Sequence, residues 1–95
     1  MSSKNKRSQL ILLGEQIRAA RSLLGWSQAE LAKKAGVAHM TVRRFEAIKG
    51  PVSGNISSLT GVQTALEKAG ISFVPADEWG SFGVRLSLQN NKNTK

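Results

Sequence analysis

The sequence predicts a mainly α-helical fold, in which a bundle of four to five helices is followed by a C-terminal β-hairpin. Apolar residues between residues 9 and 70 recur at steps of three and four, which is the period of an amphipathic helix. After residue 70 this pattern gives way to two short β-like runs separated by a segment rich in Pro, Asp, Gly and Ser. A chain of 95 residues has room for one core and not for two, so we expect a single domain.

The divisions of the chain follow from its composition. Residues 1–8 and 89–95 are polar or basic and lack apolar periodicity, so we expect a disordered basic arm and a disordered tail. Residues 9–70 are expected to form the helical domain, and residues 71–88 a β-hairpin that packs on the same domain.

The first helix is expected over residues 9–24, because its apolar residues share one face and Gly25 then ends it. That face consists of Leu10, Leu13, Ile17, Ala20 and Leu24. Ser27 and Glu30 have the spacing of a capping box, in which each side chain accepts a hydrogen bond from the backbone N–H of the other residue. A second helix is therefore expected to begin at Gln28 and to stop at Gly36, where a positive φ suits glycine.

A third helix is expected over residues 39–48, with Val42 and Phe45 on its inward face. The Gly and Pro residues of segment 50–54 indicate a loop, and Asn55 is then placed to cap a fourth helix.

The fourth helix is expected to end at Gly70 and to turn one apolar stripe inward. The stripe consists of Ile56, Leu59, Val62, Leu66 and Ala69. The runs at residues 71–74 and 83–88 predict the two strands of the hairpin. Trp79 and Phe82 fall near its turn, where packing onto the helices and a dimer contact are both open interpretations.

The charge of the chain predicts a polyanionic partner, because 14 Lys and Arg residues stand against 6 Asp and Glu and give a formal charge of +8. The absence of cysteine excludes disulfides, thiolate metal sites and cysteine nucleophiles. The longest apolar run, residues 10–13, is far shorter than the roughly 20 residues of a membrane-spanning helix, and no signal-peptide core precedes it. We therefore expect a cytoplasmic protein.

Residues 26–46 combine a capped helix, a glycine turn and a second helix, which is the order that projects a recognition helix into a major groove. The segment resembles the lambda-repressor-like helix-turn-helix family, also called Xre-type regulators. The matching residues are Ser27, Gln28, Leu31, Ala32, Gly36, Val37, Thr41, Val42, Phe45 and Glu46. The resemblance covers about residues 13–69, and residues 65–86 also resemble a C-terminal extension common in small bacterial Xre-type regulators.

The resemblance implies that the third helix reads base edges through His39, Met40, Thr41 and Arg44. Arg44 can donate two hydrogen bonds to guanine, which is worth about 1–3 kcal/mol of discrimination, whereas Met40 offers apolar contact to a thymine methyl group. Thr41 can reach either a base or the backbone.

Four further residues are expected to contact DNA phosphates. Ser27 and Gln28 lie at a helix N-terminus, where free N–H groups and the helix dipole favour an anion. Arg43 and Lys49 flank the reading helix and suit phosphates better than bases. Ala38 stands where many family members carry a capping Ser or Thr, and a lost cap costs about 1 kcal/mol.

Catalytic, metal and cofactor sites are not expected. His39 is the only histidine, and it lacks the cysteines or nearby carboxylates that a zinc site needs. The carboxylates are dispersed, and the adjacent pair Asp77 and Glu78 falls in the expected hairpin loop. Arg21 and Glu46 resemble a family pair that joins the first helix to the third, so they are interpreted as a partly buried salt bridge.

Three functional hypotheses remain open at this point. The first is a homodimeric regulator that binds a pseudo-palindromic operator, with the hairpin edge as the dimer interface. The second is a protein-binding module, such as an antiactivator of another transcription regulator, which the apolar Ala38 and Met40 on the reading face would suit. The third, a nonspecific nucleoid-type or RNA-binding protein, is weakened because no aromatic stacking platform is evident.

Overall fold

The computed structural model describes residues 13–49, 51–74 and 82–88. Its elements are α2 (Gly14–Leu24), α3 (Gln28–Ala35), α4 (His39–Ala47), α5 (Ile56–Lys68), β1 (Ile71–Val74) and β2 (Gly83–Leu86). The predicted fold class, a helical bundle with a C-terminal hairpin, is confirmed. The expected basic arm, the expected tail, Trp79 and the pair Asp77 and Glu78 lie outside the described residues.

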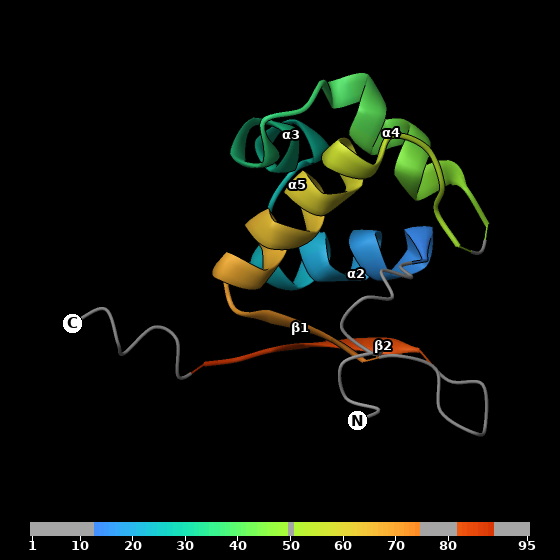
Figure 1. Cartoon of the computed structure of the whole chain (residues 1–95). Coiled ribbons are helices and arrows are strands. Elements are labelled where there is room, and N and C mark those ends of the chain that lie inside the picture. Colours follow the sequence, from blue (N-terminus) through green and yellow to red (C-terminus); the bar gives the residue numbers. More distant parts are fainter. Residues whose placement is uncertain (1–12, 50, 75–81, 89–95) are drawn as a thin grey trace, which may run out of the picture.

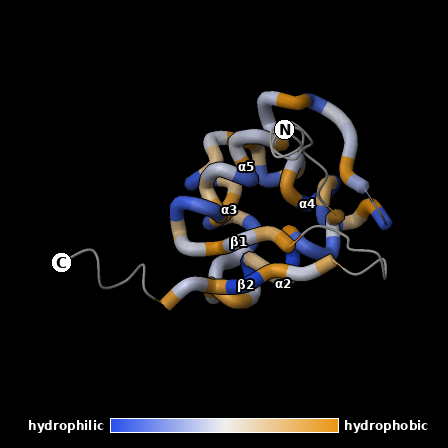
Figure 2. The backbone as a smooth tube through the Cα atoms, turned by 60° about the horizontal axis from the view of Figure 1, so that its bottom comes forward, coloured by the Kyte–Doolittle hydropathy of each residue, from blue (hydrophilic) through white to orange (hydrophobic). Residues whose placement is uncertain are grey.

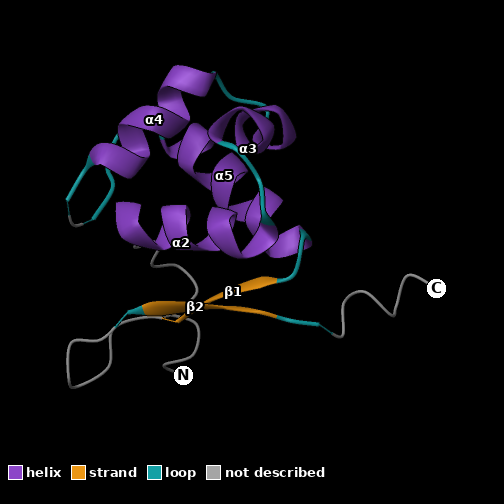
Figure 3. Cartoon of the chain, turned by 180° about the vertical axis from the view of Figure 1, so that it is seen from behind, coloured by secondary structure: helices purple, strands orange, loops and turns teal. Residues whose placement is uncertain are grey.

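The four helices form one layer, and the hairpin lies against one side of it (Figures 1 and 3). Strand β2 packs on α2, and β1 continues directly from α5. The strands pair antiparallel, with Ile71 opposite Leu86 and Val74 opposite Gly83. Figure 2 views this side and shows apolar residues recurring along both strands. Within the described part of the chain, each helix falls short of the length and apolar character that a membrane crossing requires.

The core lies where the helices meet, and it extends to the first strand. Its fully or nearly fully buried apolar residues are Ile17, Ala20, Leu31, Ala32, Val42, Phe45, Val52, Leu59, Val62, Leu66 and Ile71. The expected inward faces of the helices are confirmed at most positions. Burial of a large apolar side chain stabilises the fold by about 1.5–3 kcal/mol, which explains why these faces turn inward.

Residues 9–12 of the expected first helix lie outside the described residues, and α2 begins at Gly14. Leu13 is extended, with φ −97° and ψ 148°, and forms an isolated antiparallel bridge with Pro51. Gly14 follows as the first helical residue, and a Cβ there would lie 2.6 Å from the carbonyl oxygens of Phe45 and Ile48. The prediction that the helix runs through Leu13 is therefore wrong, because this close approach to the end of α4 sets the point where the helix starts.

The predicted helix boundaries at Gly25, Ser27 and Gly36 are confirmed. The hydroxyl of Ser27 accepts a hydrogen bond from the N–H of Glu30 at 3.0 Å, and Glu30 Oε1 accepts one from the N–H of Ser27 at 2.7 Å. Gly25 and Gly36 both have φ of 71°, a left-handed conformation in which an L side chain is strained. The turn between α2 and α3 and the turn between α3 and α4 are thus set by local sequence.

Two further expectations are wrong: that Ile56 is turned inward, and that the second strand extends to Leu88. Ile56 is 68 % exposed, because it directly follows the cap formed by Asn55 and lies in the first turn of α5, beyond the buried part of the stripe. The second strand ends at Leu86 rather than Leu88, which is 70 % exposed. The N–H of Ser87 donates to the carbonyl oxygen of Gly70, the residue just before β1. Leu88 therefore has no residue of β1 left to pair with.

Gln16 connects α2 to the end of the hairpin where Val74 and Gly83 pair. Its side chain is buried, and its Nε2 donates to the carbonyl oxygens of Gly83 at 2.9 Å and Val74 at 3.3 Å. Its Oε1 accepts a hydrogen bond from the N–H of Leu13 at 2.9 Å. A buried amide is stable only when its polar atoms are paired, so these contacts fix where the hairpin sits on the helical layer.

Arg21 and Glu46 form the expected salt bridge, and its geometry is bidentate. Arg21 Nε lies 2.8 Å from Glu46 Oε2, and Nη2 lies 3.0 Å from Oε1. Gln28 Nε2 also donates to Glu46 Oε1 at 3.0 Å, and Arg21 Nη1 donates to the carbonyl oxygen of Trp26 at 2.9 Å. The Glu46 side chain is only 3 % exposed. This cluster therefore joins α2, α4 and the start of α3.

The ionisation of Glu46 follows from these neighbours. Burial raises the pKa of its carboxyl, but the hydrogen bonds from Arg21 and Gln28 and the attraction of Arg21 and Arg18 outweigh burial, so the pKa lies below its ordinary value. The hydrogen bond to Glu46 likewise raises the pKa of Arg21. Because folding lowers the pKa of Glu46, the ionised pair adds stability above the unfolded pKa, and this stability is lost as the pH falls through the folded value.

Replacing Glu46 by Gln is expected to lower the free energy of unfolding by about 3 kcal/mol at neutral pH, because it leaves the Arg21 guanidinium without its carboxylate. Urea denaturation at neutral pH measures this loss. The wild-type protein should also lose stability as the pH falls below about 4.3, the ordinary pKa of Glu, and Glu46→Gln should lose less.

The matched control is Glu15→Gln, which removes an exposed carboxylate from the first turn of α2. It should change the free energy of unfolding by less than about 0.5 kcal/mol and leave the acid dependence largely intact. Equal effects of the two substitutions would contradict the role assigned to Glu46.

Candidate nucleic-acid interface

The start of α3 combines an exposed capping residue with a helix N-terminus. Ser27 is exposed and Gln28 is half-buried. The first backbone bond within this helix runs from the N–H of Leu31 to the carbonyl oxygen of Ser27, so the amides of residues 28 and 29 precede it. Such amides and the helix dipole favour an anion, which is the chemistry of a phosphate contact.

Gln28 has a partner within the protein. Its Nε2 donates to Glu46 Oε1, so the amide group is held toward the end of α4 and its freedom to reach a phosphate is limited. The same bond ties the start of α3 to α4. Gln28 thus helps to set the geometry of the two helices, in addition to the contact that the sequence predicts for it.

Helix α4 has a buried side and an exposed side. Val42, Phe45 and Glu46 are buried. Met40 and Arg44 lie one turn apart on the opposite side, and Met40 is 57 % exposed. The exposed side therefore presents a long apolar side chain and a guanidinium next to each other.

The remaining predicted contacts surround this pair. Arg43 is exposed on the same side of α4. The two flanks of this side are formed by His39, which is exposed, and Thr41, which is half-buried. Lys49 is exposed and follows Ile48, the residue that caps the end of α4. Six of the eight predicted contact residues are thus exposed, and Gln28 and Thr41 are half-buried.

The expected absence of a side-chain cap on α4 is confirmed. Ala38 forms no side-chain hydrogen bond at the start of the helix, and its carbonyl oxygen accepts from the N–H groups of Thr41 at 3.0 Å and Val42 at 3.4 Å. The first turn of α4 is therefore formed by backbone bonds alone, and packing through Val42 holds it in place.

The exposed cations near this surface have no acidic partner in the described residues. The one ion pair within residues 13–49, 51–74 and 82–88 joins Arg21 to Glu46. The guanidinium groups of Arg43 and Arg44 are therefore available for a polyanion. Around His39, the same residues contain no group of three His, Cys, Asp or Glu side chains that could hold a metal ion.

Arg18 is a residue of this region that the sequence analysis does not single out. It is exposed one turn before Arg21, and its charge contributes to lowering the pKa of Glu46, which places it near the junction of α2 and α4. Its spacing of three residues from Arg21 on the same helix is the signal that could have found it.

Helices α3 and α4 lie on the side of the helical layer away from the hairpin (Figures 1 and 3). They are consecutive, contact each other and are joined by the short turn through Gly36. The first helix of the pair presents its N-terminus, and the second presents an exposed side with two arginines. This arrangement has the form of a helix-turn-helix unit.

Comparison with known proteins gives the same result. Residues 17–54, which run from α2 to the loop before α5, match the family model described as Helix-turn-helix. A search of curated proteins finds none that matches the chain. This match supports the resemblance of residues 17–54 to the lambda-repressor-like, Xre-type helix-turn-helix family of DNA-binding regulators.

Proposed function

We propose that this protein is a transcriptional regulator that binds a specific operator in double-stranded DNA and reads its sequence through α4. The observation that carries this proposal is the exposed side of α4, where Met40, Arg43 and Arg44 are accessible while Glu46 anchors the opposite side. A rigid helix with donors on its exposed side is what readout of a major groove requires.

We propose that the residues that contact base edges are His39, Met40, Thr41 and Arg44. Arg44 has the most specific chemistry, because a guanidinium can donate two hydrogen bonds to O6 and N7 of guanine. Met40 would contact a thymine methyl group, and its high exposure makes it free to do so. His39 and Thr41, on the flanks, would reach bases or the adjacent backbone.

The residues that would contact DNA phosphates are Ser27, Gln28, Arg43 and Lys49. The N-terminus of α3 suits an anion, and the two cations lie on or just after α4. Since phosphate contacts carry no sequence information, these residues would provide affinity and orientation rather than choice of site.

A homodimer would double the number of bases read, with half-sites about one helical turn of DNA apart. The two-stranded sheet supports this part of the proposal, because each strand pairs with only one neighbour in the described part of the chain. The edge of β2 that has no partner among the described residues can add a strand from a second copy and form a continuous antiparallel sheet.

The alternative function is that of an antiactivator that binds another transcription regulator through the same face. The exposure of Met40 favours it, because exposed methionine suits protein-binding surfaces. The arginines of α4, which have no acidic partner in the described residues, favour DNA instead, since a guanidinium group suits both phosphate and guanine.

We expect the protein to bind DNA from upstream of its own coding sequence more tightly than a scrambled duplex, with an affinity that falls steeply with salt. Fluorescence anisotropy at two salt concentrations measures both differences. Arg44→Ala should reduce the discrimination between the duplexes by about 1–3 kcal/mol, because it removes the bidentate base contact.

Arg43→Ala is the matched control, since it removes the neighbouring guanidinium. It should weaken binding to both duplexes alike and lower the salt slope by about one. Equal, weak binding of both duplexes that does not change in Arg44→Ala would contradict operator reading and favour the protein-binding alternative.

We expect light scattering to give twice the chain mass of 10.2 kDa at the concentrations that saturate DNA. The dimer would form because pairing of two β2 edges satisfies backbone groups that otherwise face water. The mass of a single chain under these conditions would contradict the homodimer without deciding whether the protein reads DNA.

A further inference from the structure

A cavity of about 270 Å³, shallow and widely open to solvent, lies between α3 and α5, away from the exposed side of α4. It is lined by Trp26, Lys34, Ala65, Lys68 and Ala69. No residue of α4 and none of the eight predicted DNA contacts takes part in it. Its volume lies near the lower end of the roughly 300–1,000 Å³ of small-molecule sites, so it suits a ligand of about one ring.

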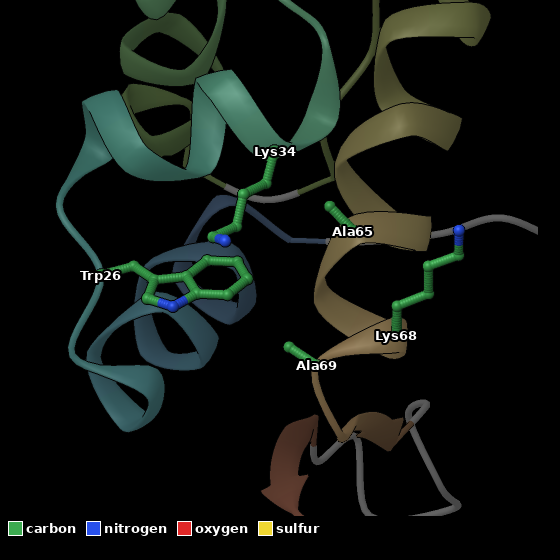
Figure 4. Close-up of a pocket in the computed structure, with 5 residues that line it drawn as sticks. All are labelled: Trp26, Lys34, Ala65, Lys68 and Ala69. Carbon is green, nitrogen blue, oxygen red and sulfur yellow. The ribbon is translucent and has the colours of Figure 1, made fainter. Parts of the chain in front are cut away.

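One side of the cavity is formed by an indole and a cation. Lys34 Nζ lies over the Trp26 ring, 5.1 Å from its centroid, which is within the range of a cation–π contact. Figure 4 shows the ammonium group beside the indole, at the side that faces α5. This contact favours positions of the ammonium beside the cavity, although the Lys34 side chain is exposed.

The other side of the cavity is small and apolar. Ala65 lies in the last turns of α5, and Ala69 caps the end of this helix; both are half-buried, and their methyl groups point toward the indole (Figure 4). Because these side chains are short, they leave the space between the helices unfilled. Lys68 contributes its stem to the rim and extends its ammonium away from the indole.

The charge of the cavity is not compensated within the described residues. Its lining contains two lysines and no acid, and the described residues contain no ion pair that involves Lys34 or Lys68. The nearest carboxylates along α3 and α5 have other partners, since Glu30 accepts from the N–H of Ser27 and Glu67 accepts from Gln63.

We propose that this cavity binds a small aromatic carboxylate. The ring would lie between the Trp26 indole and the methyl groups of Ala65 and Ala69, and the carboxylate would accept a charge-assisted hydrogen bond from Lys34. Lys68 would add attraction from the rim. The ligand would lie next to the start of α3, because Trp26 directly precedes Ser27. The carbonyl oxygen of Trp26 also accepts a hydrogen bond from Arg21.

Titration of the full chain with benzoate, followed by amide and indole N–H chemical shifts, tests the proposal. We expect saturable shifts at the Trp26 indole N–H and at the amides of Ala65 and Ala69. Benzyl alcohol, which lacks the charge, and acetate, which lacks the ring, should each bind at least about tenfold more weakly.

Lys34→Met keeps the length of the side chain and removes its charge, so it should weaken benzoate binding about tenfold. Lys33→Met is the matched control, because Lys33 is an exposed neighbour on the same helix that does not line the cavity. Its affinity for benzoate should stay within about twofold of the wild type. Ala65→Leu, which fills the cavity, should abolish the shifts while the helices remain folded.

Shifts that do not saturate, that spread over the basic surface, or that weaken equally in Lys33→Met and Lys34→Met would overturn the proposal. Benzoate binding to Ala65→Leu with wild-type affinity would do the same, because the ring would then lie elsewhere. The result does not depend on DNA binding, since the five lining residues are separate from the predicted DNA contacts.

Discussion

The bidentate contact between Arg21 and Glu46 holds the helical layer together at the point where three helices meet. A carboxylate that is 3 % exposed is costly to bury unless it is paired, and here its two oxygens accept three hydrogen bonds. One of these bonds comes from Gln28 at the start of α3, and Arg21 also donates to the Trp26 carbonyl oxygen. The angle between α3 and α4 therefore depends on this cluster as well as on apolar packing.

The consequence for function is the division of α4 into two sides. The buried side contains Val42, Phe45 and Glu46 and attaches the helix to the core. The exposed side is left with Met40 and Arg44, which have no structural task in the described part of the chain. Side chains on a rigid helix can be placed on base edges with little loss of freedom, so the stability of the cluster and the proposed readout of DNA are linked physically.

Features that depend on neighbouring residues could be predicted from the sequence, such as the capping box at Ser27 and the glycine stops. The family pattern predicted the salt bridge of Glu46 and the exposed positions of α4. Features that depend on distant segments could not be predicted. The late start at Gly14 arises from the approach of α4, and Gln16 bonds to residues 58 and 67 positions away. The cavity beside Trp26 likewise depends on how α3 and α5 pack.

The exposed side of α4 and the start of α3 are proposed to form the surface that touches DNA. Amide chemical-shift mapping of the full chain with a duplex from upstream of its coding sequence tests this claim most directly. We expect the largest chemical-shift changes at Ser27, His39, Met40 and Arg44, and small ones along β2. Changes concentrated on the hairpin or spread evenly over the basic surface would contradict it.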